Sequence, residues 1–324
     1  MTQKKIELQA PDISRWSKGN TGVPYAWQFD SGKPGPTVMV QAITHGNEIC
    51  GAIALDWFLS QGFKPEKGKL TLTFGNIAAY QRWDPDQPSQ NRYVDQDLNR
   101  VWSEEILNGT KSSVEIDRAR ELVRFVDEAD FLLDIHSMHE PCAPLMVCGV
   151  TGRGAGKAVE MSKKLGVPQY LMYDTGHPAG PRMIERGGFS DPDSPKVAIL
   201  IECGQHWEKL AAEVAIDTLM KFLVETGTLS SAVASPHFRP QLDYSGRQKI
   251  IEVTEAVAAK SQDFRFIKEF KGLEVIEKKG DVIGYNGTEE IKAPYDKTVL
   301  VMPAVSKQWT IGTTMVRLGR LIEG

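Results

Sequence analysis

Short runs of apolar residues recur along the first two thirds of the chain, and each run ends in polar residues. Most of these runs lack the alternation of apolar and polar positions that marks a strand with one exposed face. They therefore predict strands that are buried on both faces. The runs lie at 37–43, 70–74, 131–135, 145–147 and 197–201.

Segments with the apolar spacing of a helix separate these predicted strands. In the last of them, Leu219, Phe222 and Leu223 recur at intervals of three and four that place them on one helix face. Strands that alternate with helices predict an α/β fold, with a mostly parallel or mixed sheet and helices on both of its faces. The predicted helices cover 49–61, 113–128, 155–165 and 208–225.

The pattern changes after Gly227. Residues from about 230 to 240 are rich in Ser, Ala and Pro and predict a linker. Short alternating runs punctuated by Gly and Pro follow, which is typical of a small all-β domain. The sequence thus predicts one domain over residues 1–229 and a β-rich C-terminal domain over residues 241–324. The alternating runs lie at 249–253, 281–283, 298–301 and 315–318.

Composition narrows the class of partner. The chain has 324 residues, 41% of them hydrophobic and 25% charged, which is ordinary for a globular enzyme. A net charge of −4 without a basic block argues against nucleic acid. No apolar run is long enough to span a bilayer, and no secretory signal is recognisable, so we expect no membrane partner. The cysteines form no Cys-x-x-Cys pair and predict a reduced, cytoplasmic protein; they are Cys50, Cys142, Cys148 and Cys203.

Three predicted strands end in side chains that bind metal ions. His45 and Glu48 follow the first strand in the run His-Gly-Asn-Glu. His136 ends another strand, and Asp134 lies two residues earlier on the same strand face. Glu202 ends a third. Two histidines and one glutamate fill three positions of a zinc site and leave the fourth for water, whose proton a further glutamate can take.

Each of these residues also has a plainer interpretation. Glu48 could only cap the following helix while His45 lies on the surface. His136 could be a core histidine with satisfied hydrogen bonds. The interpretation of His136 as a core histidine is less convincing because a second strand end carries another histidine. A buried carboxylate at Glu202 is costly without a partner or a role, and Asp134 could orient a metal-bound imidazole.

Arg92 and Arg100 frame a polar segment that contains Asn99. Arginine binds carboxylates through two parallel hydrogen bonds, and an adjacent asparagine can fix a second oxygen. The alternative, which composition alone favours, is a solvated loop with surface ion pairs.

In order and spacing, these motifs resemble the succinylglutamate desuccinylase and aspartoacylase family, which belongs to the zinc carboxypeptidase superfamily. The resemblance covers roughly residues 30 to 225. It implies a zinc carboxypeptidase-like fold and one Zn²⁺ per chain, held by His45, Glu48 and His136.

The resemblance also implies roles in catalysis and substrate binding. Glu202 would be the general base and proton shuttle, and Arg92 would polarise the scissile carbonyl. Asn99 and Arg100 would hold the substrate carboxylate. The family's C-terminal domain can contribute a tyrosine, for which Tyr295 is the candidate together with Tyr285.

The implied function is that of a zinc-dependent amidohydrolase, which deacylates a small N-acyl amino acid or a similar carboxylate-bearing amide through a zinc-activated water. Two other functions stay open. One is a zinc carboxypeptidase acting on peptide C-termini, and the other is a non-catalytic protein that binds zinc or a small molecule. The expected partners are a small-molecule substrate and, as a further possibility, other copies of the chain in a homo-oligomer.

Overall fold

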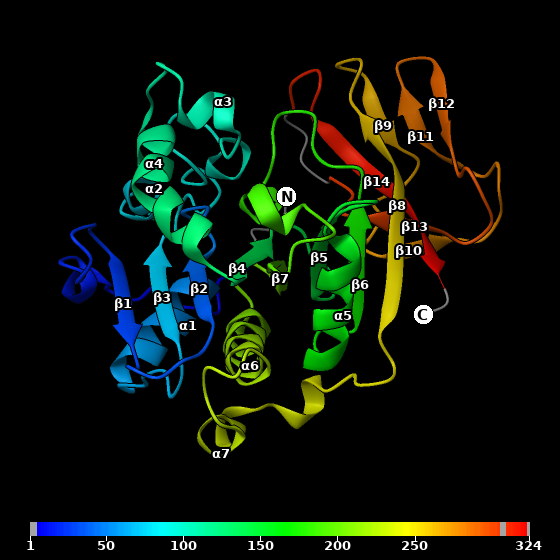
Figure 1. The fold of residues 1–324 in the computed structure, drawn as a ribbon. Helices are drawn as coiled ribbons and strands as arrows, with labels where there is room; N and C mark the ends of the chain where they lie inside the picture. Colours follow the sequence, from blue (N-terminus) through cyan, green and yellow to red (C-terminus); the bar gives the residue numbers. More distant parts are fainter. Residues whose placement is uncertain (1–4, 305–308, 323–324) are drawn as a thin grey trace.

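The computed structural model describes residues 5–304 and 309–322 (Figure 1). Its strands are β1 (Ala26–Asp30), β2 (Thr37–Ala42), β3 (Lys69–Phe74), β4 (Phe131–Met138), β5 (Leu145–Val150), β6 (Tyr170–Asp174), β7 (Val197–Gln205), β8 (Lys249–Ala258), β9 (Phe264–Phe266), β10 (Glu274–Ile276), β11 (Val282–Asn286), β12 (Glu289–Lys292), β13 (Thr298–Val301) and β14 (Thr314–Ile322).

The α-helices are α1 (Ile49–Ser60), α2 (Ile77–Tyr80), α3 (Glu104–Leu107), α4 (Val114–Glu128), α5 (Ala155–Leu165), α6 (Lys209–Glu225) and α7 (Ser231–Ala234). Short 3₁₀ helices are η1 (Ser14–Trp16), η2 (Leu98–Arg100), η3 (Met183–Glu185), η4 (Gly187–Phe189), η5 (Ser235–His237) and η6 (Pro240–Leu242).

One 11-stranded sheet runs through the molecule, in the order β1-β3-β2-β4-β7-β5-β6-β8-β14-β13-β10. Strands β3, β2, β4 and β7 are parallel, whereas β5 runs antiparallel to β7. Strands β6 and β8 continue parallel to β5, and the remaining pairs are antiparallel. The prediction of an α/β fold with a mostly parallel or mixed sheet is confirmed.

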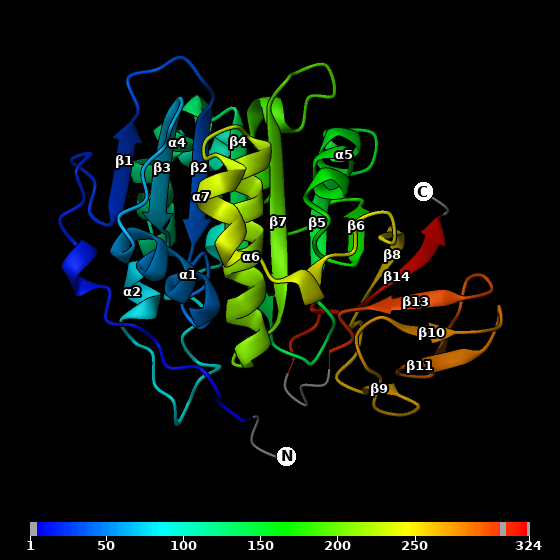
Figure 2. The ribbon, with the colours of Figure 1, turned by 90° about the horizontal axis from the view of Figure 1, so that it is seen from below.

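Helices cover both faces of the central sheet, as Figure 2 shows for α1, α6 and α7 in front of the strands and α4 behind them. Helices α1, α5 and α6 share a buried core with Val38 and Val40 of β2. Helix α4 packs on the opposite face with Met39 and with the segment that contains η3 and η4. Because successive residues of β2 are buried on opposite faces, the strand is apolar without alternation.

Local signals explain where two of the helices begin and end. The side chain of Ser113 accepts a hydrogen bond from the N–H of Ile116 and so caps α4, and Glu115 and Asp117 lie in the first turn. Helix α5 ends at Gly166, which has the left-handed conformation that glycine adopts without steric cost. Both helices therefore form where the sequence predicts them.

The C-terminal strands extend the main sheet and add a second, 3-stranded sheet in the order β12-β11-β9. Strand β8 pairs with β6, so the large sheet continues across the segment 230–240 into the C-terminal part. That segment contains α7, η5 and η6 in place of an extended linker. The division into domains at this point stays a prediction.

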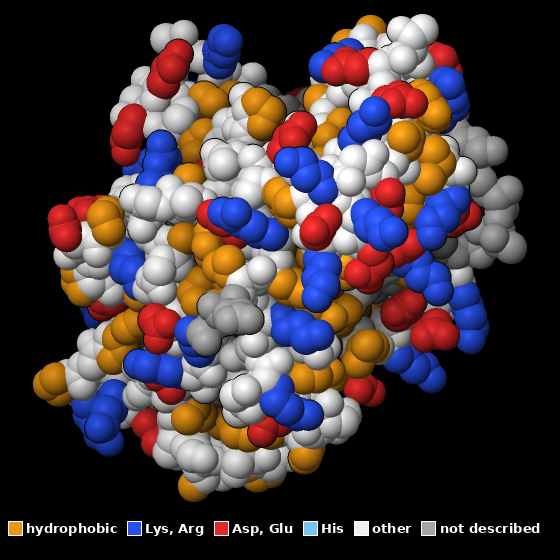
Figure 3. All heavy atoms as spheres, turned by 90° about the vertical axis from the view of Figure 1, so that its right-hand side faces the viewer, with side chains coloured by type: hydrophobic (Ala, Val, Ile, Leu, Met, Phe, Trp, Pro, Cys, Tyr) orange, Lys and Arg blue, Asp and Glu red, His pale blue; other side chains and the backbone are white. Residues whose placement is uncertain are grey.

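Charged side chains of both signs are interspersed over the outer face of the C-terminal strands (Figure 3). Ion pairs of the C-terminal part include Lys260 with Glu289 and Arg320 with Glu252. Exposed pairs of this kind contribute little to stability, about 0–1 kcal/mol each. Among the helices of the described residues, none is long and apolar enough to cross a membrane.

Candidate metal centre

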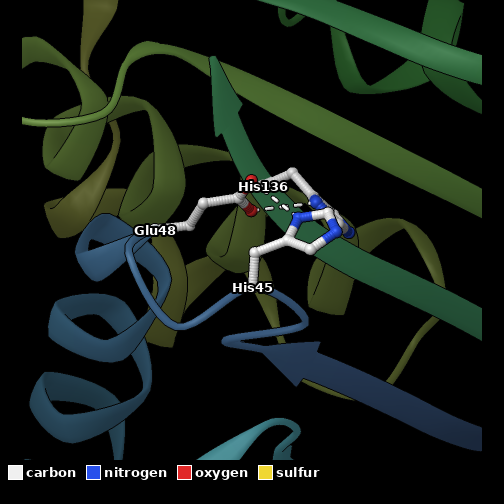
Figure 4. A group of neighbouring side chains, drawn as sticks. All are labelled: His45, Glu48 and His136. Atoms are coloured by element: carbon white, nitrogen blue, oxygen red, sulfur yellow. Dashed lines mark hydrogen bonds and ion pairs between the residues drawn. The ribbon is translucent and has the colours of Figure 1, made fainter. Parts of the chain in front are cut away.

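Three buried side chains, His45, Glu48 and His136, converge on one point (Figure 4). His45 Nδ1 lies 2.8 Å from Glu48 Oε1, and His136 Nδ1 lies 2.9 Å from Glu48 Oε2. One possible ligand atom from each residue falls within 4.8 Å of the others. The structure thus brings the three predicted ligands together.

The turn after β2 places two of these side chains. Ile43, two residues before His45, has a positive φ of 59°, which is unfavourable for a β-branched residue and marks a constrained turn. Gly46 fits because a Cβ there would lie 2.4 Å from the carbonyl oxygen of Asn91. Glu48 precedes α1, yet its side chain makes no capping hydrogen bond. Its carboxylate turns toward the two histidines instead, so the simple capping interpretation is wrong.

Two aspartates contact the Nε2 atoms of the imidazoles, which are the ring nitrogens that do not contact Glu48. Asp134 Oδ2 lies 2.8 Å from His136 Nε2, and Asp97 Oδ1 lies 2.9 Å from His45 Nε2. A carboxylate accepts hydrogen bonds, so a neutral His136 carries its proton on Nε2 and presents the lone pair of Nδ1 to Glu48. Asp97 does not fix the tautomer of His45 in the same way, because His45 Nε2 also lies 2.9 Å from Arg92 Nη2, which can only donate. Acceptors that face each other at such distances require either a proton or a metal cation between them.

In the absence of a metal ion, the contacts of the cluster favour positive charge on the imidazoles and negative charge on Glu48. Burial alone would raise the pKa of Glu48, but His45 and His136 hold that pKa well below its usual value. Burial lowers the pKa of His136, but Asp134 and Glu48 raise it by more, to well above its usual value, so a metal ion would have to displace a proton from this imidazole. Nitrogen and carboxylate donors in a buried cluster of three fit a zinc ion that keeps one open position. The residues therefore fit the metal that the sequence implies.

Asp134 belongs to a chain of buried hydrogen bonds that extends beyond the cluster. Thr44 donates a hydrogen bond of 2.8 Å from its hydroxyl to Asp134 Oδ1, and Gln41 donates one of 2.8 Å to Thr44. Asp134 therefore has a defined orientation of its own. Its contacts agree with the orienting role that the sequence suggests for it.

Glu202 lies beside the cluster, on the strand next to that of His136. The two residues are directly paired across β4 and β7, so their side chains share a sheet face. Glu202 Oε2 is buried without a hydrogen bond among the described residues. Burial raises the pKa of Glu202 to about 8, and the negative charge of Glu48 adds to that effect. Such a carboxyl group binds and releases a proton near neutral pH.

Arg92 reaches the cluster from the segment between α2 and η2. Its Nη2 lies 2.9 Å from His45 Nε2 and 3.1 Å from Asp97 Oδ2, and its Nη1 lies 3.5 Å from Glu48 Oε1. The Arg92 side chain is 38% exposed, so part of the guanidinium is accessible beside the metal ligands. Burial lowers the pKa of Arg92. The carboxylates of Asp97 and Glu48 raise it by more, so the guanidinium stays positively charged.

Asn99 and Arg100 lie in η2, close to the same cluster. The N–H of Met183 donates a hydrogen bond of 2.9 Å to Asn99 Oδ1, so this side chain also ties η2 to η3. Arg100 Nη1 donates a hydrogen bond of 2.6 Å to the carbonyl oxygen of Asn99. Burial lowers the pKa of Arg100 to about 10, as does the nearby charge of Arg92. The Arg100 guanidinium is thus a partly desolvated cation beside the candidate metal centre.

The structure does not bring Tyr295 into this cluster. Its hydroxyl lies 2.9 Å from Thr254 Oγ1 on β8. Thr254 lies at an irregularity in the pairing of β8 with β14, where its hydroxyl donates a hydrogen bond of 3.3 Å to the carbonyl oxygen of Leu318. Tyr285 lies on β11, 4.7 Å from the guanidinium of Arg265. A substrate contact from either tyrosine stays a prediction.

Two contributing residues were not recognised in the sequence. Asp97 contacts both His45 and Arg92, as described above, and Glu115 anchors the segment that carries them. The buried Glu115 carboxylate accepts hydrogen bonds from the side chain of Asn76 and from the backbone N–H groups of Val94, Asp95 and Gln96. In the sequence, Glu115 is only an acidic residue in the first turn of a helix, which gives no sign of this role. The run Asp-Gln-Asp-Leu-Asn, which contains Asp97, indicates only a polar loop.

We expect Asp97→Asn to weaken zinc binding roughly 10- to 100-fold, the usual effect of losing a carboxylate that orients a ligating imidazole. The amide keeps the shape of the side chain but not its charge. Competition with a chromogenic chelator measures the affinity. Asp86→Asn, an exposed position in the same segment, is the matched control. Unchanged affinity in Asp97→Asn would show that His45 does not depend on Asp97.

The fold and the site together define a mixed α/β protein with a buried His-Glu-His cluster that fits a metal ion. The chain belongs to the succinylglutamate desuccinylase/aspartoacylase family, because the model of that family's catalytic domain matches residues 34–223. The family assignment made from the sequence motifs is therefore confirmed.

Individual relatives agree with this assignment. The probable aspartoacylase of Parasynechococcus marenigrum (strain WH8102) is 32% identical over 141 residues, which are 41% of this chain and 45% of that protein. The match thus spans less than half the length of that relative.

Solved structures show the same fold. A succinylglutamate desuccinylase/aspartoacylase from Rhodobacter sphaeroides has a TM-score of 0.63 at 17% identity, over 90% of this chain and 87% of that one. A succinylglutamate desuccinylase from Vibrio parahaemolyticus has a TM-score of 0.64 at 15% identity, over 93% of this chain and 87% of that one.

Proposed function

We propose that this chain is a zinc-dependent amidohydrolase that removes the acyl group from a small N-acyl amino acid or a similar carboxylate-bearing amide. The observation that carries the proposal is the buried His45-Glu48-His136 cluster, with the unpartnered carboxyl oxygen of Glu202 on the neighbouring strand. A protein that only bound a metal or a small molecule would need no second glutamate at that position. Family membership supports an amide substrate.

The three ligand side chains would hold one zinc ion per chain. Zinc, when bound, lowers the pKa of a coordinated water to about 7 and polarises a carbonyl oxygen. Glu202 takes the proton of the attacking water and returns it to the departing amine nitrogen, which amide hydrolysis requires because an amide anion is a poor leaving group.

Two arginines complete the proposed site. The accessible part of Arg92 faces the charge that develops on the carbonyl oxygen in the transition state. Arg100, with Asn99, binds the substrate carboxylate and sets the position of the scissile bond. The substrate is a small molecule, and nucleic acid and membranes are not part of the proposal. We place the activity in the cytoplasm, and a homo-oligomer is compatible with it.

Release of primary amine from a panel of N-acyl amino acids and short peptides tests this function in the zinc-loaded protein. We expect turnover of one or a few N-acyl amino acids and none of the peptides. Turnover of peptides alone would identify a carboxypeptidase instead. Zinc binding without turnover of any member would overturn the proposed deacylase activity.

A further inference from the structure

The segment 91–97 carries two side chains of the candidate site, Arg92 near its start and Asp97 at its end. The structure describes all of its residues, and they form neither helix nor strand. No ladder of backbone hydrogen bonds therefore holds this segment in place. Its position has to come from contacts with other parts of the chain.

The start of the segment is joined to the turn that carries His45. The N–H of Gly46 donates a hydrogen bond of 2.9 Å to the carbonyl oxygen of Arg92. The side chain of Asn91 donates one of 3.1 Å to the carbonyl oxygen of Gly46. These two bonds fix the backbone at Arg92 relative to the turn, but they do not reach the residues that follow.

A buried carboxylate holds the middle of the segment. Glu115, in the first turn of α4, is fully buried. Its Oε1 accepts a hydrogen bond of 2.6 Å from the N–H of Val94 and one of 2.9 Å from the amide of Asn76. Its Oε2 accepts bonds of 3.1 and 3.2 Å from the N–H groups of Asp95 and Gln96. Hydrogen bonds to an ionised acceptor are roughly twice as strong as neutral ones, so Glu115 is a firm anchor.

The segment in turn contacts the beginning of α4. Asp95 Oδ2 accepts a hydrogen bond of 2.8 Å from the N–H of Val114, and the side-chain amide of Gln96 donates one of 2.5 Å to Ser113 Oγ. The first N–H groups of a helix have no acceptor within the helix, so an acceptor from outside stabilises the helix end as well. The contacts between residues 94–96 and 113–115 are therefore reciprocal, and all of them depend on the same position of the segment.

We propose that Glu115 is a positioning residue that sets Arg92 and Asp97 against the metal ligands as one unit. Val94 lies two residues after Arg92, and Gln96 directly precedes Asp97, so the bonds to Glu115 fix the backbone between the two side chains. Asp97 acts on the metal centre through the imidazole that it contacts. The effect on Arg92 rests on the proposed function, whereas the effect on Asp97 concerns metal binding alone.

A double-mutant cycle on zinc affinity tests the proposal without any need for turnover. We expect Glu115→Gln to weaken zinc binding roughly 3- to 10-fold. Whichever way the glutamine turns, its NH₂ group faces two of the four donors and cannot accept from them. In the Asp97→Asn background, the same substitution should weaken binding less than about twofold, because the residue through which Glu115 acts is already altered. Equal losses in both backgrounds, measured by competition with a chromogenic chelator, would overturn the proposal.

Kinetics at saturating zinc test the effect on Arg92. For an N-acyl amino acid that the protein hydrolyses, Glu115→Gln should lower kcat roughly 10- to 100-fold, as a displacement of about 1 Å in a catalytic group can do. KM should change less than about twofold, since Arg92 faces charge that develops only in the transition state. A higher KM with unchanged kcat would contradict the effect on Arg92. The zinc cycle decides the role of Glu115 even if the protein hydrolyses no amide.

Three further measurements separate positioning from a loss of folding. Hydrogen exchange of the backbone at 94–96 should become faster in Glu115→Gln, while exchange in β4 stays at the wild-type rate. Asp95→Ala changes only the exposed side of the contact and should also weaken zinc binding. Asp117→Asn removes the other acidic group in the first turn of α4, which is exposed, and should leave zinc affinity unchanged. Faster exchange at 94–96 with wild-type zinc affinity in Glu115→Gln would show that Asp97 keeps its place without Glu115, and the proposal would fail.

Discussion

Replacement of Glu202 with glutamine is expected to lower kcat roughly 100- to 10,000-fold, the contribution typical of a positioned general base. The amide keeps the size of the side chain but can neither accept the proton of water nor return it to the amine. Since Glu202 is not one of the three clustered ligands, zinc content should stay at one ion per chain. Steady-state kinetics and metal analysis on the same preparation measure both quantities.

Glu213→Gln is a suitable control for this variant. Glu213 lies on α6, which packs on the sheet face opposite to that of Glu202. The control should retain wild-type kcat and zinc content. Full activity in Glu202→Gln would remove the assignment of Glu202 as the base. Loss of zinc together with activity would instead place Glu202 among the metal ligands.

The central fold could be predicted because its strands are buried on both faces. In β2, for example, both faces of the strand are buried, so most of its positions are apolar. Neither a surface helix nor a loop requires such a run. Strand direction could not be predicted in this way. The run that forms β5 pairs antiparallel with β7, and β8 joins the same large sheet next to β6. Both outcomes depend on tertiary packing, which the apolar run itself does not encode.

The shortest strands escaped prediction for a related reason. Strands β9 and β10 have three residues each, and the pattern of a single face cannot be read from so few positions. Strand β1 is only five residues long, and burial does not alternate along it, because Trp27, Gln28 and Phe29 are all half-buried. It pairs at the edge of the sheet with β3, so its place is set by a partner that follows more than 35 residues later in the chain.

The ligand residues were predictable because each stands at the end of a buried strand, where a polar side chain is unexpected. Asp97 could not be predicted in this way, because its role depends on a contact with His45, which lies 52 residues away in the sequence.

Zinc should stabilise the folded protein strongly, and His136→Ala should abolish that effect. In the metal-free protein, Glu48 and Asp134 are buried with His136 between them. A ligand that binds only the folded state adds about 4 kcal/mol when its free concentration is about 1,000 times its Kd. For a chain of this size that corresponds to a rise in Tm of roughly 5 to 10 °C. Thermal unfolding of chelator-treated protein, with and without added zinc, measures the shift.

The zinc-dependent shift is the informative quantity, since His136→Ala also alters the metal-free protein. Removing the imidazole leaves Glu48 and Asp134 buried without their shared partner, so the Tm of the metal-free variant should itself fall. His237→Ala provides the matched control, because His237 packs against Trp57 and Phe63 on the far side of α1 and contacts none of the ligand residues. That control should keep the full zinc-dependent shift. A shift that persists in His136→Ala would place the zinc site elsewhere in the chain.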